Sequence, residues 1–206
     1  MATLLAVLAA YLIGSISFAV ITSRLFGLPD PRTYGSGNPG ATNVLRSGRK
    51  AAAIATLAGD AAKGAVPVLL VRWLGTSLGM GEAALAGAAL GAFIGHLYPL
   101  YFGFKGGKGV ATALGVVLGL SGWLALVALV VFLGVVLATR YVSLASILAA
   151  VAAAAATPAL FGAGWIALSM AVMALLIVWR HRANVRRLLD GQESRLGARK
   201  TAPPQA

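Results

Sequence analysis

The sequence contains no cysteine and very few acidic residues or histidines. Its 206 residues include no Cys, five Asp and Glu residues in total, and two His. Without cysteine the chain cannot form disulfides, use a catalytic thiolate or bind a metal through sulfur. The few histidines and carboxylates leave little material for any other metal site. We therefore expect no metal and no cofactor.

Several residue patterns of known catalytic sites are also missing. The chain has no G-x-S-x-G nucleophile elbow, and no His is placed with a carboxylate in a way that suggests a catalytic triad. The H-x-x-x-x-D pattern of many acyltransferases is absent too, because Tyr101 follows His96 at that distance and Arg186 follows His181. Catalysis by this chain would therefore depend on positioning and positive charge rather than on a strong protein base or nucleophile.

Apolar residues dominate the rest of the chain. Hydrophobic residues make up 59% of the sequence, and its mean hydropathy of +0.87 is far above that of a soluble domain. A helix that spans a bilayer needs about 20 apolar residues. We predict an all-α integral membrane protein with about seven transmembrane helices, some of them short. The predicted spans cover residues 4–21, 51–73, 83–101, two limbs within 110–138, 142–156 and 165–179, with a turn over 157–164. We expect one domain over 1–197 and a disordered cytoplasmic tail over 198–206.

The positions of the cationic residues predict the orientation. The net charge is +12, but the basic residues lie in the loops between spans and in the tail. This placement favours membrane topology and anionic lipid headgroups over nucleic acid, which we do not expect as a partner. The first Lys or Arg is Arg24, after the first apolar run, so we expect this run to be a retained span and not a signal peptide. With the N-terminus outside and the C-terminus cytoplasmic, Arg72 alone lies on the outer side, where we expect it to extend to the interface.

Residues 110–138 permit either one pass or two. A single helix would be about 44 Å long, too long for a hydrocarbon core of about 30 Å without steep tilt. It would also place the arginine-rich tail outside. A break at Ser121-Gly122 gives two short passes and keeps the tail inside, and we choose that arrangement.

Two opposite charges interrupt the second span. Asp60 and Lys63 are three positions apart and share one face of a helix. Since isolated charges in a bilayer are costly, we expect them to pair inside the bundle. A structural ion pair and a role at a functional site fit this spacing equally well.

The first polar loop, residues 35–46, reads GSGNPGATNVLR. Its glycines allow a ligand to approach the backbone closely, Ser36, Asn38, Thr42 and Asn43 add neutral hydrogen-bonding groups, and Arg46 adds a fixed cation. No carboxylate lies nearby, so the loop suits a phosphate or another anion. The alternative is an ordinary turn at Asn38-Pro39-Gly40.

The second polar loop, residues 103–109, carries Lys105 and Lys108 around Gly106-Gly107. A helix is expected to begin at about Val110, and its free N–H groups would add to an anion site. The loop is not a nucleotide P-loop, because Gly109 follows Lys108 where Ser or Thr is required. The two lysines could instead be membrane-topology anchors. Likewise, His96 could be a structural hydrogen-bonding residue.

A third polar segment opens the tail. Residues 180–189 place Val185, Leu188 and Leu189 on one helical face with arginines around them. This pattern predicts a short amphipathic helix on the inner leaflet.

Together these segments resemble the three signatures of the bacterial acyl-phosphate:glycerol-3-phosphate acyltransferases, the PlsY family. The first signature is residues 35–46, the second combines Gly95-His96 with FKGGKGVAT at 104–112, and the third is HRANVRRLLDGQE at 181–193. The resemblance extends from about residue 10 to residue 195. Ser17 and Ala145 depart from the family pattern, outside all three signatures.

The resemblance implies transfer of a fatty acyl group from acyl phosphate to the 1-hydroxyl of sn-glycerol 3-phosphate, giving lysophosphatidic acid and inorganic phosphate. This is the first acylation of bacterial phospholipid synthesis. It implies the cell (inner) membrane, an active site that faces the cytoplasm and contacts with membrane lipids. It also implies a functional link to the enzyme that makes acyl phosphate and to the next acyltransferase.

The resemblance also implies roles for individual residues. Arg46 and Lys105 are expected to be catalytic. The expected substrate-binding residues are Ser36, Gly37, Asn38, Gly40, Thr42, Asn43, His96, Gly106, Gly107, Lys108, Gly109, Thr112, Ser143, His181 and Asn184. Within the first signature, the residues expected to hold acyl phosphate are Ser36, Gly37, Asn38, Thr42 and Asn43. Glycerol phosphate should be oriented by Lys105, Ser143, His181 and Asn184. A transporter for a phosphorylated lipid or anion and a non-enzymatic membrane scaffold are the alternatives.

Overall fold

The computed structural model describes residues 1–197, and every regular element in this range is a helix. The tail over 198–206, predicted to be disordered, lies outside the described residues. The helices are α1 (Ala2–Gly14), α2 (Phe18–Leu25), α3 (Ala41–Leu45), α4 (Lys50–Leu74), α5 (Glu82–Leu97), the 3₁₀ helix η1 (Leu100–Phe102), α6 (Val110–Leu120), α7 (Gly122–Thr139), α8 (Val142–Phe161), α9 (Trp165–Arg180) and α10 (Arg182–Leu189).

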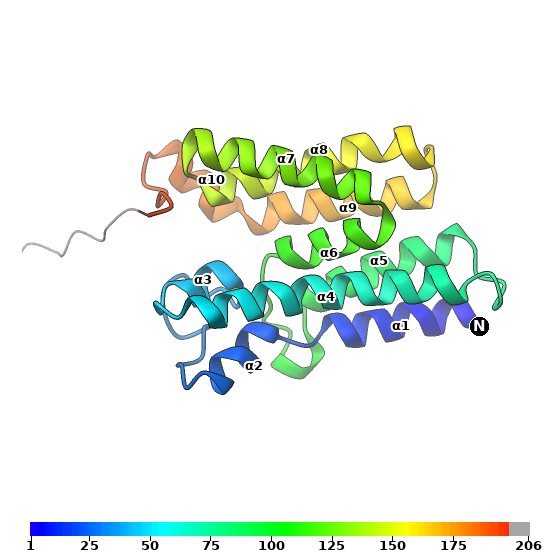
Figure 1. Ribbon diagram of the computed structural model, residues 1–206, viewed down its shortest axis with the longest axis horizontal. Helices are drawn as coiled ribbons and strands as arrows, with labels where there is room; N and C mark the ends of the chain where they lie inside the picture. The colour runs from blue at the N-terminus through cyan, green and yellow to red at the C-terminus, as the bar shows by residue number, and fades with distance from the viewer. Residues whose placement is uncertain (198–206) are drawn as a thin grey trace, which may run out of the picture.

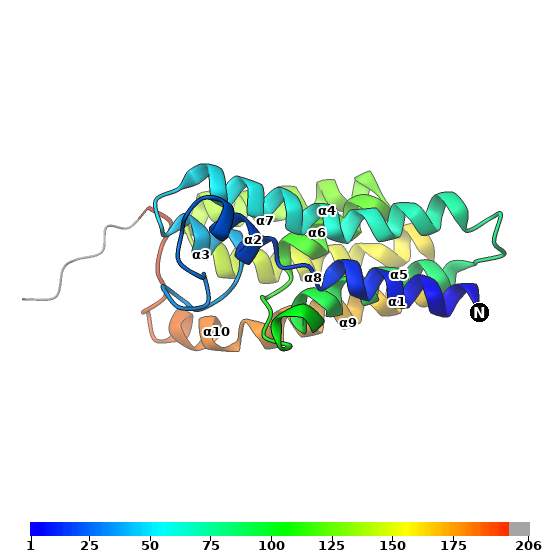
Figure 2. The same cartoon turned by 90° about the horizontal axis from the view of Figure 1, so that it is seen from below.

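The long helices lie side by side along the longest axis of the molecule (Figure 1). Helices α1, α4 and α5 form one half, α7, α8 and α9 form the other, and α6 lies between them. Both views show α2, α3 and α10 at the end opposite Met1 (Figures 1 and 2). We call this end, with the segments that connect its helices, the loop end.

The helix lengths confirm the predicted class of an all-α membrane protein. Among the described residues, five helical stretches are long and apolar enough to cross a bilayer, counting α1 with α2 and α5 with η1 as one stretch each. The pair α9–α10, bent by 56°, would be a sixth. Helix α6 is apolar but shorter, in agreement with the prediction that some passes are short.

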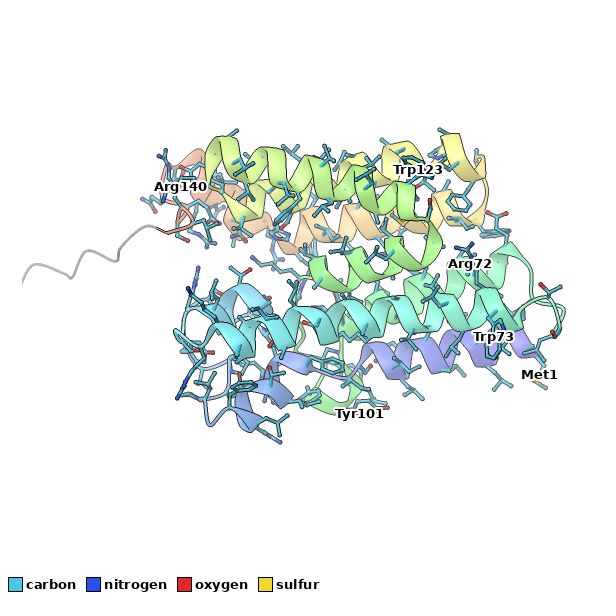
Figure 3. The ribbon with its side chains drawn as sticks, viewed as in Figure 1. Met1, Arg72, Trp73, Tyr101, Trp123 and Arg140 are labelled. Carbon is cyan, nitrogen blue, oxygen red and sulfur yellow. The ribbon has the colours of Figure 1, made fainter. Side chains whose placement is uncertain are left out.

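The chain breaks at Ser121, as predicted. Ser121 is extended (φ −164°, ψ 128°), and α6 and α7 run in opposite directions on either side of it. Because α6 has only 11 residues, it is about 16 Å long. Its last carbonyls are capped by Arg72, whose Nη1 donates to Gly119 O at 3.1 Å and to Leu120 O at 3.0 Å. Arg72 lies near the Met1 end (Figure 3), and its guanidinium binds the end of α6.

The predicted span over 4–21 lies within one apolar stretch, Ala2–Leu25, but this stretch is not one unbroken helix. Helix α1 ends at Gly14 and α2 begins at Phe18, with Ser15 and Ser17 in the break. The Ser15 hydroxyl donates to Tyr11 O at 2.8 Å, and Lys63 Nζ donates to Ile16 O at 2.6 Å. The bond from Lys63 satisfies a backbone carbonyl that has no helical partner at the break, which makes the interruption tolerable at membrane depth.

The predicted turn over 157–164 begins too early, because α8 continues to Phe161. Thr157 remains helical and its hydroxyl donates to Ala153 O at 2.7 Å. Pro158 removes one N–H near the end of the helix, where an alanine-rich sequence otherwise favours the helix. The actual turn begins at Gly162, whose φ of 72° suits glycine.

A buried ionic cluster joins α4 to α5 and to the α1–α2 break. Lys63 Nζ lies 2.8 Å from Asp60 Oδ1, and both side chains are only 2% exposed. His96 Nδ1 of α5 lies 3.7 Å from the same Asp60 oxygen. With the bond from Lys63 to Ile16 O, the cluster connects three segments. Asp60 and Lys63 therefore form the internal pair that their spacing predicts.

We expect Lys63→Met to destabilise the protein, because Asp60 would keep a buried charge without its cation. Breaking a buried ion pair costs about 3–5 kcal/mol. The unfolding temperature in detergent should fall well below that of Lys50→Met, which removes an exposed lysine from the start of α4. The double variant Asp60→Asn/Lys63→Met should recover part of the loss. Equal unfolding temperatures for the two single variants would contradict this role.

Candidate active site

The first signature folds around the buried side chain of Asn43. Asn43 Oδ1 accepts from Ser36 N at 2.9 Å and from Ser36 Oγ at 3.2 Å. Asn43 Nδ2 donates to Pro31 O at 2.7 Å and to Tyr34 O at 3.1 Å. Both ends of the amide are thus bound within the loop, so Asn43 fixes the loop's shape. The side chains of Ser36, Thr42 and Arg46 remain exposed around it.

The second signature packs its glycine backbone directly on the end of α5. A Cβ on Gly106 would lie 2.0 Å from His96 O, and a Cβ on Gly107 would lie 2.3 Å from His96 Nε2. Only glycine fits at such distances. Gly107 N donates to His96 O at 3.2 Å, and Gly109 (φ 84°) turns the chain into α6. The loop is therefore held by contacts that its glycines permit.

The third signature begins where α9 meets α10. His181 and Asn184 are both buried there. His181 Nδ1 lies 2.8 Å from Ile177 O, and a carbonyl can only accept, so Nδ1 carries the proton and Nε2 is the acceptor nitrogen of the neutral ring. Asn184 Oδ1 accepts a hydrogen bond from Lys108 Nζ. Lys108 belongs to the second polar loop, residues 103–109, which we call the glycine loop. This bond connects the second signature to the third.

The carboxylate of Glu193 accepts hydrogen bonds from three side chains of the site. Glu193, just beyond α10, accepts from Ser143 Oγ at 2.7 Å, from Asn184 Nδ2 at 2.6 Å and from Arg187 Nε at 2.7 Å. Burial opposes the ionisation of Glu193, but these three hydrogen bonds outweigh it and hold its pKa below the usual value. Ser143 at the start of α8 is thereby joined to the third signature.

The first signature contacts the second signature and the residue that follows the third. Pro39 O would lie 3.2 Å from a Cβ on Gly107, so the first and second loops are in contact. Arg46 Nη2 lies 3.5 Å from Ser194 Oγ, one residue beyond Glu193. The segments that the sequence separates by more than 140 positions therefore meet at the loop end.

The site is strongly cationic, and this charge affects two neighbouring groups. The pKa of Lys108 is lowered to about 8, chiefly by burial; Glu193 opposes this shift, and the cations of Arg187, Arg180 and Arg46 add to it. Burial, followed by the charge of Lys108, lowers the pKa of His181 to about 4. At neutral pH His181 is therefore uncharged, and the positive charge resides on the lysine and arginine side chains.

Not every residue of the expected site lies in this meeting point. Thr112 is fully buried on α6, and its hydroxyl has no hydrogen-bond partner among the described residues. His96 is buried behind the glycine loop and faces Asp60. Lys105 is exposed at the start of the loop. Two apolar grooves, between α7 and α8 and between α1 and α4, contain none of the expected site residues. The described chain also has no cluster of His and carboxylates able to bind a metal.

Three residues of the site were absent from the expected list. Glu193 belongs to the third signature, and its position among arginines near the end of the chain was the one available signal. Arg187 pairs with Glu193 at 2.7 Å. Arg180 donates to the carbonyls of Gly106 and Gly107, a contact over more than 70 positions that no local pattern predicts.

Comparison with known proteins supports the family resemblance. The profile of the family described as glycerol-3-phosphate acyltransferase matches residues 4–191. The glycerol-3-phosphate acyltransferases of Ralstonia pickettii and Paraburkholderia xenovorans are 54% and 55% identical to this chain, covering 98% and 100% of it and 97% and 96% of the relatives.

Two crystal structures have the same fold. Both are of PlsY (YgiH), an integral membrane glycerol 3-phosphate acyltransferase, in a glycerol 3-phosphate form and a lysophosphatidic acid form. The TM-scores are 0.88 and 0.86 at 43% and 42% identity, with 96% of each chain covered in both comparisons. This chain therefore belongs to the glycerol-3-phosphate acyltransferase family.

Proposed function

We propose that this protein transfers a fatty acyl group from acyl phosphate to the 1-hydroxyl of sn-glycerol 3-phosphate. The products are lysophosphatidic acid and inorganic phosphate. The observation that carries the proposal is the meeting of three glycine- and cation-bearing segments at the loop end. Both substrates and both products carry phosphate, so a site rich in cations and backbone donors suits them. The two PlsY crystal forms, with glycerol 3-phosphate and with lysophosphatidic acid, support this choice.

We further propose that the loop end faces the cytoplasm of a bacterial inner membrane. Among the described residues, Arg140, α2 with Arg24 and the arginine-bearing α10 lie at the loop end, whereas Arg72 lies near Met1 at the other (Figures 1 and 3). Excess positive charge is typical of the cytoplasmic side. This orientation gives the site access to soluble glycerol 3-phosphate, while the acyl chains remain in the membrane. Its partners would be the enzyme that makes acyl phosphate and the next acyltransferase.

The first loop is the proposed cradle for acyl phosphate. Ser36, Asn38 and Thr42 would bind the phosphate through their side chains, and Gly37 and Gly40, whose N–H groups donate to Tyr34 O and Asn38 O, would let it approach the backbone closely. The exposed Arg46 would neutralise charge on the departing phosphate. Asn43 acts through the loop, because its own amide is fully bound to Ser36, Pro31 and Tyr34.

Glycerol 3-phosphate would lie against the second and third signatures. Lys105 and Lys108 supply positive charge, and the backbone N–H groups of Gly106 and Gly109 supply donors. Gly107, Thr112 and His96 support the loop from behind, since Gly107 N donates to His96 O. Ser143 and Asn184 already bind one anion, the Glu193 carboxylate. They are thus oriented towards negative charge at this place.

The geometry also suggests where the hydroxyl proton goes. His181 Nε2 can accept a hydrogen bond from the glycerol 1-hydroxyl, since Nδ1 holds the ring proton. A pKa of about 4 is too low for His181 to keep a second proton at neutral pH. We propose that the hydroxyl oxygen forms the new ester bond to the acyl carbon while the bond from that carbon to phosphate breaks. As this bond breaks, the hydroxyl proton turns from His181 Nε2 to an oxygen of the departing phosphate, which keeps it as part of inorganic phosphate.

The test is direct. Purified protein is given acyl phosphate and glycerol 3-phosphate, and lysophosphatidate and released phosphate are measured in the same samples. Equal amounts of both products are expected, and none when acyl-CoA replaces acyl phosphate. Product from acyl-CoA would overturn the proposed donor. Transport of either compound into vesicles without product would favour a transporter.

Lys105→Ala should lower kcat by on the order of 10² if its ammonium stabilises charge in the transition state. Lys50→Ala, which removes another exposed lysine, is the matched control. Turnover equal to that of the control would remove Lys105 from the catalytic residues.

Arg46→Lys keeps the charge but loses the planar fork that binds two phosphate oxygens. We expect a loss in kcat/KM on the order of tenfold or more. Arg49→Lys makes the same exchange at an exposed position three residues away and should leave kcat/KM unchanged. Equal kcat/KM values for the two variants would mean that Arg46 does not bind phosphate and only contributes positive charge to the membrane topology.

Activity should fall as pH rises through about 8, because Lys108 then loses its proton and the site loses a positive charge. In Lys108→Arg the guanidinium stays charged, so the alkaline decline should move to higher pH even if the maximal rate is lower. The profile of kcat/KM against pH, corrected for spontaneous hydrolysis of acyl phosphate, measures this. An alkaline decline at the same pH in both proteins would assign it to another group.

A further inference from the structure

Arg180 holds the glycine loop through three hydrogen bonds to its carbonyls. Its Nη2 donates to Gly106 O and to Gly107 O, both at 2.8 Å, and its Nε donates to Gly107 O at 3.0 Å. The guanidinium carbon lies 5.8 Å from the ring centre of Tyr98, at the end of α5. Arg180 is the last residue of α9, so these contacts attach the loop to the opposite half of the molecule.

These bonds fix the direction of the neighbouring N–H groups. In a trans peptide the C=O and N–H point in opposite directions. The Gly107 carbonyl faces Arg180, so the N–H of Lys108 faces away from it. In the described part of the chain, the N–H groups of Lys108 and Gly109 donate to no acceptor. Both immediately precede α6, where the helix dipole adds partial positive charge.

We propose that Arg180 is a positioning residue that orients the two peptides whose carbonyls belong to Gly106 and Gly107, so that the N–H group of Lys108, next to that of Gly109, receives the phosphate of glycerol 3-phosphate. This proposal rests on the proposed function. Arg180 acts on the loop and does not touch the substrate. Its guanidinium has Nε and Nη2 occupied by carbonyls and lies beside an aromatic ring, an arrangement that the single ammonium of lysine cannot reproduce.

Arg180→Lys tests this directly, with Arg186→Gln as the control. Arg186 is exposed on α10, and its replacement also removes a cation near the site. Three quantities are measured: the unfolding temperature in detergent, amide hydrogen exchange of the peptide that covers 103–110, and KM for each substrate.

In Arg180→Lys we expect normal unfolding, faster exchange over 103–110 and a KM for glycerol 3-phosphate raised about tenfold or more, because a displacement of about 1 Å in a positioning group can cost up to ~10²-fold. The KM for acyl phosphate should change much less. Arg186→Gln should match the wild type in all three. Loop exchange and KM at wild-type values in Arg180→Lys would overturn the proposal, as would equal increases in the two KM values.

A second variant covers the case in which Arg180→Lys does not fold. Tyr98→Leu removes the ring beside the guanidinium but keeps the donors of Arg180, and should raise exchange over 103–110 to a smaller extent. Exchange at the wild-type value would count against the proposal. If the wild type itself transfers no acyl group, the proposed function fails, whereas loop exchange still shows whether Arg180 holds the loop.

Discussion

The glycine loop must lie in direct contact with α5 while its other side is held by α9 and α10. Gly106 and Gly107 allow the first contact, because any side chain there would overlap His96. Arg180 and Asn184 make the second, through the loop carbonyls and through Lys108. Since α5 and α9 belong to different halves of the bundle, this one loop joins the halves at the loop end (Figure 1). The meeting of the three signatures depends on that junction.

The electrostatics of the site follow from its unequal charges. One buried carboxylate, Glu193, faces Lys108, Arg187 and, through its neighbour Ser194, Arg46. Its three hydrogen bonds orient Ser143, Asn184 and Arg187 towards an anion. The excess of cations remains available for substrate phosphates. Burial and the nearby cations lower the pKa values of Lys108 and His181, and His181 is therefore a neutral hydrogen-bond acceptor.

Much of the fold could be predicted because hydropathy and positive charge limit a membrane chain to few arrangements. The break at Ser121 was predictable from span length and from the arginines of the tail. The break at Ser15–Ser17 was not, because it depends on a hydrogen bond from Lys63 to Ile16 O across 47 positions. The extension of α8 through Pro158 was missed because the local signals indicated a turn, whereas the alanine-rich sequence before Pro158 favours the helix.

In the candidate site, too, local sequence patterns were predictable and contacts between distant residues were not. The three signatures could be found from glycines, cations and their order in the sequence. Asn43 was expected to contact substrate, yet its amide is bound within its own loop, which its sequence neighbours do not show. Arg180 and Glu193 act through contacts with residues 73 and 50 positions away, at Gly107 and Ser143. Such roles depend on tertiary packing, so a single sequence contains no direct sign of them.

The contact between Lys108 and Asn184 can be measured without background, since the chain contains no cysteine. Cysteines are introduced at both positions, and the protein in its membrane is treated with a short bifunctional thiol reagent. The account predicts an intramolecular cross-link between the peptides of α10 and the glycine loop in the double variant and in neither single variant, as detected by mass spectrometry. No cross-link in a folded double variant whose two thiols both react with a monofunctional reagent would contradict the meeting of these segments.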